Sequence, residues 1–125
     1  MIPYGKHDVK LYEALKVAFQ IRFRSLTQGS KIEEFEKLVA EMVGAKYAVA
    51  VSSATAGLHI AMIALNLPNN SKVITSPISF VASANSIIYA GHQPVFVDID
   101  RDSVNLDLDL VKQKINTDSS VHAVV

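Results

Sequence analysis

The 125-residue sequence has no cysteine and no tryptophan, and its charges balance, with 12 basic and 12 acidic side chains. Without cysteine, disulfides and thiolate metal sites are excluded, and the composition agrees with a reducing cytoplasm. No cluster of lysine or arginine provides the basic surface that nucleic-acid binding requires, so we expect no nucleic-acid partner. The four histidines show no metal-ligand spacing, and we expect no metal site.

The sequence also lacks the segments that target a chain to a membrane. The polar N-terminus has no apolar run of the kind found in signal peptides. No apolar stretch reaches the roughly 18 residues of a membrane-spanning helix, and the most apolar one, residues 54–67, is interrupted by Gly57 and His59. We therefore expect a cytoplasmic protein with no membrane partner. Hydrophobic residues nevertheless make up 50% of the chain, which favours a surface covered by more chain or by a second subunit.

Hydrophobic periodicity predicts an alternation of helices and strands. Two amphipathic helices are expected at residues 9–23 and 31–43, separated by turn-forming residues and ended by Gly44. The continuous apolar run at residues 47–51 predicts a central strand, buried on both faces of a parallel sheet. The other expected elements are helices at 54–67, 79–89 and 108–115, and strands at 72–75, 94–98 and 122–125.

This order of elements predicts an α/β fold, a mainly parallel sheet flanked by helices on both faces. We divide the chain into an N-terminal helical segment, residues 1–44, and a sheet-forming segment, residues 45–125. The last expected strand has no turn or cap after it, which predicts that the chain is part of a larger domain.

The first candidate site is the segment at residues 52–58, which leads from the expected strand at 47–51 into a helix with small opening residues. The first turn of a helix has free backbone N–H groups and positive potential, so small side chains there admit a phosphate. In the competing interpretation, the hydroxyl of Ser52, Ser53 or Thr55 simply caps the helix. Considered alone, the residue types favour the cap.

Two further candidates follow strands at the carboxyl edge of the expected sheet, where open α/β folds bind their ligands. Phe80 could present its ring face to a flat cofactor, or it could be a core residue at a helix start. Asp98 and Asp100 could bind a ligand, but aspartate more often bonds the local backbone. We expect these two carboxylates to be structural.

Five segments, in order and spacing, resemble the DegT/DnrJ/EryC1/StrS family of sugar-nucleotide aminotransferases, which depend on pyridoxal 5′-phosphate (PLP). They are Ile-Pro-Tyr-Gly at 2–5, Leu-Thr-Gln-Gly at 26–29 with Ile32, Phe35 and Glu36, Ser-Ala-Thr-Ala-Gly-Leu at 53–58, Val-Ile-Thr-Ser-Pro-Ile-Ser-Phe-Val-Ala-Ser-Ala-Asn at 73–85, and Pro-Val-Phe-Val-Asp-Ile-Asp at 94–100. The segment Ser-Pro-Ile-Ser-Phe at 76–80 is most similar to the corresponding segment of one subgroup of the family. The enzymes of this subgroup aminate a UDP-linked 4-keto-6-deoxy-hexosamine on the way to pseudaminic acid. The resemblance implies the N-terminal part of the large domain of the fold-type I PLP-dependent aminotransferase fold.

The resemblance also implies roles for particular residues. It implies that Ala54 and Thr55 bind the cofactor phosphate through the backbone and the Thr55 hydroxyl, and that Phe80 stacks on the pyridine ring. The family's two catalytic groups are a lysine that binds the cofactor covalently and an aspartate that keeps the pyridine nitrogen protonated. Neither matches a residue up to Val125, so we expect no catalytic residue in this chain.

For the substrate, the resemblance implies that Thr27, Gln28 and Gly29 lie near the sugar-nucleotide site and the interface of a homodimer. The implied function is amination of a nucleotide-linked keto-deoxysugar by an amino-acid donor such as glutamate, in polysaccharide biosynthesis. This chain alone is expected to be inactive. Two alternatives stay open: a PLP-family sugar dehydratase, in which histidine replaces the lysine, and a short non-catalytic scaffold that binds phosphate or dimerises.

Overall fold

The structure is a computed structural model that describes residue 5, residues 8–25, residue 27 and residues 29–125. The contacts within the chain divide it into two compact units, Met1–Ala50 and Val51–Val125, and each is described by itself. The domain division expected at residues 44 and 45 stays a prediction.

The described residues of the first unit form two helices, as the periodicity predicts. Helix α1 (Leu11–Phe23) begins after Lys10, whose backbone N–H donates to the Glu13 carboxylate at 2.8 Å. Helix α2 (Ser30–Val43) ends at Gly44, which has the left-handed conformation (φ 67°) that glycine adopts without steric cost. Among the described residues of the two helices, only Ala40 is buried.

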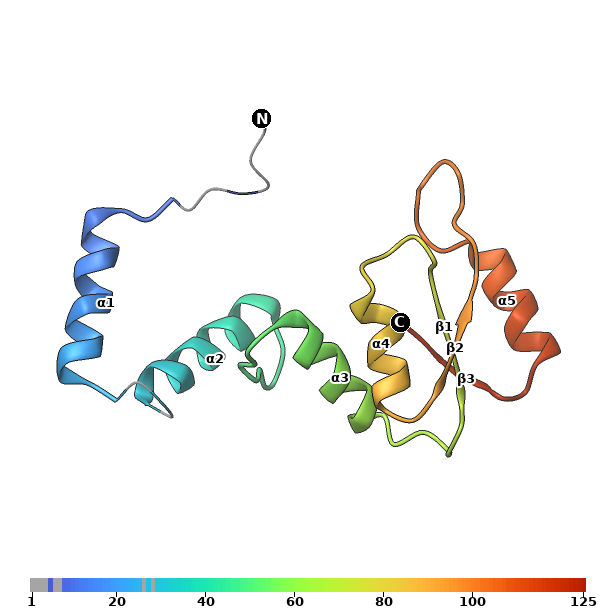
Figure 1. The fold of residues 1–125 in the computed structure, drawn as a ribbon, viewed down its shortest axis with the longest axis horizontal. Coiled ribbons are helices and arrows are strands. Elements are labelled where there is room, and N and C mark those ends of the chain that lie inside the picture. The colour runs from blue at the N-terminus through green and yellow to red at the C-terminus, as the bar shows by residue number, and fades with distance from the viewer. Residues whose placement is uncertain (1–4, 6–7, 26, 28) are drawn as a thin grey trace. The chain divides into compact units, whose positions relative to one another are not determined.

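The second unit is a parallel sheet with helices on both faces. Its elements are α3 (Ala54–Ala64), β1 (Lys72–Thr75), α4 (Ala82–Tyr89), β2 (Gln93–Phe96), α5 (Leu108–Thr117) and β3 (Val121–Val124). The strand order is β2-β1-β3, and β1 pairs in parallel with both neighbours. Figure 1 shows α4 and α5 on opposite faces of this sheet, and α3 packs against α4. The predicted α/β fold with a parallel sheet is confirmed.

Strand β1 separates two apolar clusters, because successive side chains of a strand point to opposite faces. On one face Val73 packs with Met62 of α3 and Ile87 of α4, and all three are at most 1% exposed. On the other face Ile74 packs with Val111 of α5. Helices therefore cover both faces of β1, as a parallel sheet requires.

The strand expected at residues 47–51 is not formed, so this prediction is wrong. In the described part of the chain this segment has no strand partner, and the central strand is β1. The side chains of Tyr47 and Val49 are 75% and 76% exposed, and the N–H of Ala50 donates to the Glu36 carboxylate instead of to a strand. A strand needs a neighbouring backbone to pair with its N–H and C=O groups. The apolar run indicates only that these side chains favour burial, and it does not show whether such a neighbour is present.

The most apolar helix, α3, is shorter than expected. It ends at Ala64 rather than residue 67, because Asn66 turns the chain in the left-handed conformation (φ 47°). His59 packs edge-on against Tyr89 of α4, with ring centroids 5.6 Å apart. Within the described ranges, no helix combines the length and the apolar character needed to cross a bilayer.

Candidate functional site

The segment at residues 52–58 forms the start of α3, and its cap is a single serine. Ser53 is the N-cap residue, and its Oγ accepts a hydrogen bond from the N–H of Ala56 at 3.2 Å. Its backbone oxygen accepts the N–H of Gly57 at 3.0 Å. Of the three hydroxyls considered as caps, the Ser53 hydroxyl is the one that caps this helix.

This cap leaves two backbone amides for a ligand. The N–H groups of Ala54 and Thr55 lie in the first turn, before any amide that can bond within the helix. Neither amide has an acceptor in the described part of the chain. The side chains around them are small, and the positive end of the helix dipole adds to their attraction for an anion. The residues at this helix start therefore fit a phosphate group, and the cap and the phosphate site are compatible.

Phe80 lies on the loop between β1 and α4, and its side chain is 76% exposed. This exposure excludes its interpretation as a core residue. The loop is fixed to the first turn of α4, because the N–H of Ser83 donates to the Phe80 oxygen at 3.0 Å and the Ser79 and Ser83 hydroxyls lie 3.1 Å apart. The loop follows the carboxyl end of β1, so an exposed ring is available at the ligand-binding edge of the sheet.

Sequence reasoning missed Thr75, the last residue of β1. Its side chain is 1% exposed, and within the described ranges its hydroxyl has no hydrogen-bond partner. A buried hydroxyl without a partner costs about 1–3 kcal/mol, so Thr75 is an unusual residue for the centre of a sheet. Threonine is also a common strand residue, and nothing in the sequence distinguishes this one from an ordinary β-former.

The two aspartates bond the local backbone, as expected. Asp100 accepts the N–H of Ser103 at 2.8 Å, and this hydrogen bond lowers the pKa of the Asp100 carboxyl below its ordinary value. Asp98 accepts the N–H of Ile99 at 2.8 Å. Over the residues that the structure describes, no three acidic or histidine side chains are grouped as a metal site would need.

The residues assigned to the substrate lie on the connection between α1 and α2, in the first unit. Thr27 is exposed, and Gly29 is the N-cap residue of α2. A Cβ atom at Gly29 would come within 3.0 Å of the Ser25 oxygen, so the close approach of the backbone favours glycine here. Gln28 lies outside the described residues. Ala54, Thr55 and Phe80 belong to the second unit, and the roles assigned to both groups of residues stay predictions.

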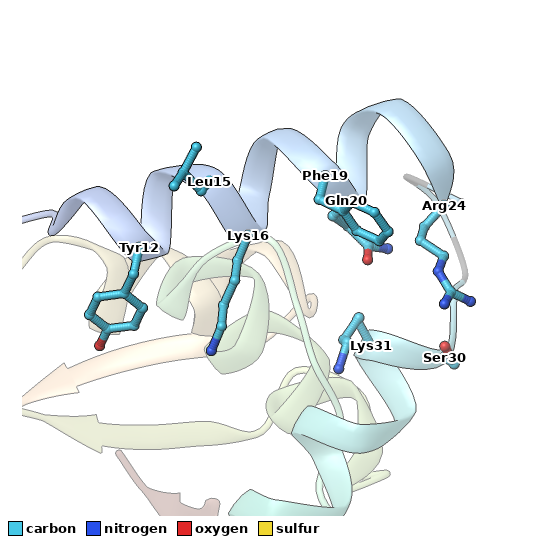
Figure 2. Close-up of a pocket in the computed structure, with 8 residues that line it drawn as sticks. All are labelled: Tyr12, Leu15, Lys16, Phe19, Gln20, Arg24, Ser30 and Lys31. Carbon is cyan, nitrogen blue, oxygen red and sulfur yellow. The ribbon is translucent and has the colours of Figure 1, made fainter.

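A pocket of about 680 Å³ lies between α1 and the start of α2, next to this connection (Figure 2). Eight described residues line it, of which three are basic and none is acidic. Figure 2 shows Tyr12, Lys16 and Gln20 projecting from α1 toward the side on which Lys31 lies. No residue of this pocket was singled out from the sequence, because basic and aromatic residues on a helix usually form an ordinary solvated surface.

The parallel sheet with helices on both faces makes this chain an α/β protein. The sequence profile of the DegT/DnrJ/EryC1/StrS aminotransferase family matches residues 11–125. The chain belongs to this family, which confirms the prediction from the sequence.

Individual relatives agree with this assignment. The spore coat polysaccharide biosynthesis protein SpsC of Bacillus subtilis is 42% identical over 106 residues, which are 85% of this chain and 27% of that protein. The putative sugar aminotransferase Spr1654 from Streptococcus pneumoniae, in its PMP-form, has a TM-score of 0.90 at 28% identity, covering 98% of this chain and 31% of that one. Helicobacter pylori PseC, an aminotransferase involved in the biosynthesis of pseudoaminic acid, has a TM-score of 0.87 at 27% identity, covering 98% and 33%.

These neighbours are sugar aminotransferases of fold type I, so the predicted fold is confirmed. The chain spans about a third or less of the length of each of these relatives.

Proposed function

We propose that this chain forms the cofactor-phosphate-binding part of a PLP-dependent enzyme that moves an amino group from an amino acid to a nucleotide-linked keto-deoxysugar. Family membership over residues 11–125 supports the aminotransferase class. The observation that carries the proposal for this chain is the start of α3, where the amides of Ala54 and Thr55 have no acceptor among the described residues.

The cofactor fits the residues at this site. The amides of Ala54 and Thr55, with the Thr55 hydroxyl, would donate hydrogen bonds to phosphate oxygens, and Phe80 would pack its exposed ring on the pyridine face. Bound PLP supplies the electron-withdrawing ring that the transfer of an amino group needs. Support comes from Spr1654, which has also been solved in a PLP-form, with a TM-score of 0.83 over 90% of this chain.

The proposed substrate is a nucleotide-linked sugar. Residues 76–80 resemble the subgroup of the family that acts on UDP-linked hexosamines, so a substrate of this kind is proposed here. The names of two relatives support the assignment of a sugar as the substrate. Spr1654 is named a putative sugar aminotransferase, and SpsC is named a spore coat polysaccharide biosynthesis protein. Thr27, Gln28 and Gly29 would lie near this substrate. The cysteine-free composition supports a cytoplasmic location.

We further propose a homodimer, supported by the apolar surface of α1. Leu15, Phe19 and Phe23 are 62%, 55% and 64% exposed, and α1 has no buried residue. Apolar side chains at this density on one helix are typical of a surface covered by a partner.

The chain alone is proposed to be inactive, because the family's catalytic lysine and aspartate match none of its residues. The test adds PLP to the purified chain and records the visible spectrum before and after borohydride reduction, followed by mass spectrometry. We expect weak binding that requires the phosphate, with PLP preferred to pyridoxal, and no stoichiometric lysine adduct. A stoichiometric adduct, or amination of a keto-sugar nucleotide by the chain, would contradict the proposal.

A matched pair of variants tests the phosphate site. Thr55→Val removes one hydroxyl and should weaken PLP binding about tenfold, because hydrogen bonds to a charged group are strong. Thr117→Val removes a hydroxyl that bonds the Gln113 oxygen at the end of α5 and should leave PLP binding unchanged. Equal effects of the two variants would show that the phosphate is bound elsewhere.

A further inference from the structure

The exposed ring of Phe80 depends on its backbone for a fixed position. Its side chain is 76% exposed, so packing contacts restrain the ring little. The ring lies on the loop at residues 76–81, between two buried residues, Thr75 at the end of β1 and Ala82 at the start of α4. How firmly this loop is held therefore decides how well the ring is oriented before a ligand arrives.

Serine hydroxyls restrain the loop at two points. The Ser76 Oγ accepts a hydrogen bond from the N–H of Ile78 at 3.0 Å. The hydroxyl oxygens of Ser79 and Ser83 lie 3.1 Å apart, so that one hydroxyl donates to the other. Ser79 directly precedes Phe80 in the sequence, and this second bond therefore joins the backbone next to the ring to the first turn of α4.

The bond between Ser79 and Ser83 is not a helix cap. A capping serine accepts a hydrogen bond from a backbone N–H in the first turn of its helix. The N-cap residue of α4 is Val81, whose side chain cannot accept a hydrogen bond. The Ser79 hydroxyl bonds a side chain instead, so its main effect is on the loop rather than on the stability of the helix.

Helix α4 gives this bond a rigid base. The Ser86 hydroxyl donates to the backbone oxygen of Ser83 at 2.8 Å, and Ser86 is fully buried. The next residue, Ile87, packs in the apolar cluster with Val73 of β1. The turn of α4 that carries Ser83 is therefore fixed to the sheet, and the loop is bonded to a part of the chain that has little freedom to move.

We propose that Ser79 and Ser83 are positioning residues, which hold the Phe80 ring in the orientation that stacks on the pyridine ring of PLP. This inference rests on the proposed function. A loop that is ordered before the ligand binds loses less conformational entropy on binding, which raises the affinity. The serine pair acts on the ring end of the cofactor only, because the phosphate end is assigned to the start of α3.

The experiment compares Ser79→Ala with Ser79→Thr, which keeps the hydroxyl. Without ligand, NMR relaxation of the Phe80 ring and backbone should show more motion in Ser79→Ala than in the wild type and in Ser79→Thr. The Kd for PLP should rise about threefold to tenfold in Ser79→Ala, the factor expected for one lost hydrogen bond, and Ser79→Thr should restore it. Unchanged motion of Phe80 in Ser79→Ala would overturn the proposal.

Inorganic phosphate separates positioning of the ring from a general loss of structure. The Kd for phosphate should be the same in Ser79→Ala and in the wild type, because this anion does not contact Phe80. Ser119→Ala, at an exposed serine in the turn before β3, is the control and should leave both Kd values unchanged. An equal loss of affinity for phosphate and for PLP in Ser79→Ala would show a general structural effect and overturn the assignment.

Double variants test whether the two serines act together and through Phe80. Ser83→Ala should match Ser79→Ala, and the combination should add no further loss of PLP affinity, because both substitutions remove the same bond. In a Phe80→Ala background, Ser79→Ala should no longer change the Kd for PLP. Additive effects in either cycle would contradict the positioning role.

Failure of this proposal and of the proposed function can be told apart. Phosphate-dependent PLP binding that is unchanged in Ser79→Ala removes the role of the serine pair and leaves the cofactor site. Greater motion of Phe80 in Ser79→Ala, in a chain that does not bind PLP, supports the role of the serine pair in holding the loop and counts against the cofactor site.

Discussion

The two units of the chain differ in how far their apolar side chains are buried. In the second unit, β1 lies between two clusters, and Met62, Val73 and Ile87 are at most 1% exposed. In the first unit, α1 has no buried residue, and the only buried residue of α2 is Ala40. A sheet with helices on both faces buries apolar side chains against residues of the same unit. Two helices alone bury few of theirs, so their apolar side chains need further contacts to be buried.

The largest expected difference comes from one substitution made in each unit. Met62→Ala should lower the free energy of unfolding by about 2–5 kcal/mol, because it leaves a cavity in the apolar cluster that Met62 forms with Val73 and Ile87. Met42→Ala, at a side chain that is 85% exposed, should change it by no more than about 0.5 kcal/mol. Urea denaturation followed by circular dichroism measures both, and equal losses would contradict the comparison.

Hydrogen exchange should show the same contrast without any mutation. Amides of β1 are bonded to two neighbouring strands and should exchange at least about tenfold more slowly than those of α1, which no buried side chain stabilises. Proton exchange followed by NMR gives rates residue by residue. Protection of α1 equal to that of β1 would show that the first unit is stabilised by contacts that its exposed side chains do not reveal.

The sequence predicted only part of this difference between the two units. The apolar runs at β1, β2 and β3 and the periodicity of α1 and α2 identified these elements, because local hydrophobic patterns reflect which side chains prefer burial. The run at residues 47–51 has the same pattern and forms no strand, since pairing depends on a neighbouring backbone.

The candidate site shows the same limit. The small residues at the start of α3 predicted a helix start open to an anion, but the sequence did not show which hydroxyl caps it. The exposure of the Phe80 ring depends on packing between distant segments, so no local pattern indicates it. The same holds for the Thr75 hydroxyl, which has no hydrogen-bond partner among the described residues.

The N-cap of α3 gives a smaller effect. Ser53→Ala should lower the free energy of unfolding by about 0.5–2 kcal/mol, because the Ala56 amide loses its acceptor. Ser119→Ala, at an exposed serine in the turn before β3, is the matched control and should be nearly neutral. A neutral Ser53→Ala would mean that the cap bond is replaced by water at no cost.

The smallest effect concerns acid stability in the second unit. Asp118 accepts a hydrogen bond from the Lys72 ammonium at 2.8 Å, and this bond lowers the pKa of the Asp118 carboxyl far below its ordinary value. Since the folded-state pKa is the lower one, the bond stabilises the fold above the unfolded-state pKa of about 4. This stabilisation is lost as the pH falls through the folded-state pKa.

Thermal unfolding between pH 7 and pH 2 tests this sign. Asp118→Asn should lower the Tm at pH 7 and flatten the fall of Tm toward low pH. Asp109→Asn, whose carboxylate pairs with Lys112 and is 92% exposed, should leave the profile close to that of the wild type. A profile for Asp118→Asn that runs parallel to the wild type would contradict the assigned role.

The most direct test of the central claim follows the backbone amides of Ala54 and Thr55 by 1H–15N NMR while ligands are added. We predict that PLP and inorganic phosphate shift both signals and that pyridoxal, which lacks the phosphate, does not. The amides of Asp109 and Leu110 at the start of α5 should not move, because the Asp107 carboxylate already accepts them at 2.9 Å and 3.1 Å. Unchanged signals for Ala54 and Thr55, or equal shifts with pyridoxal, would contradict the assignment of the α3 start as the phosphate site.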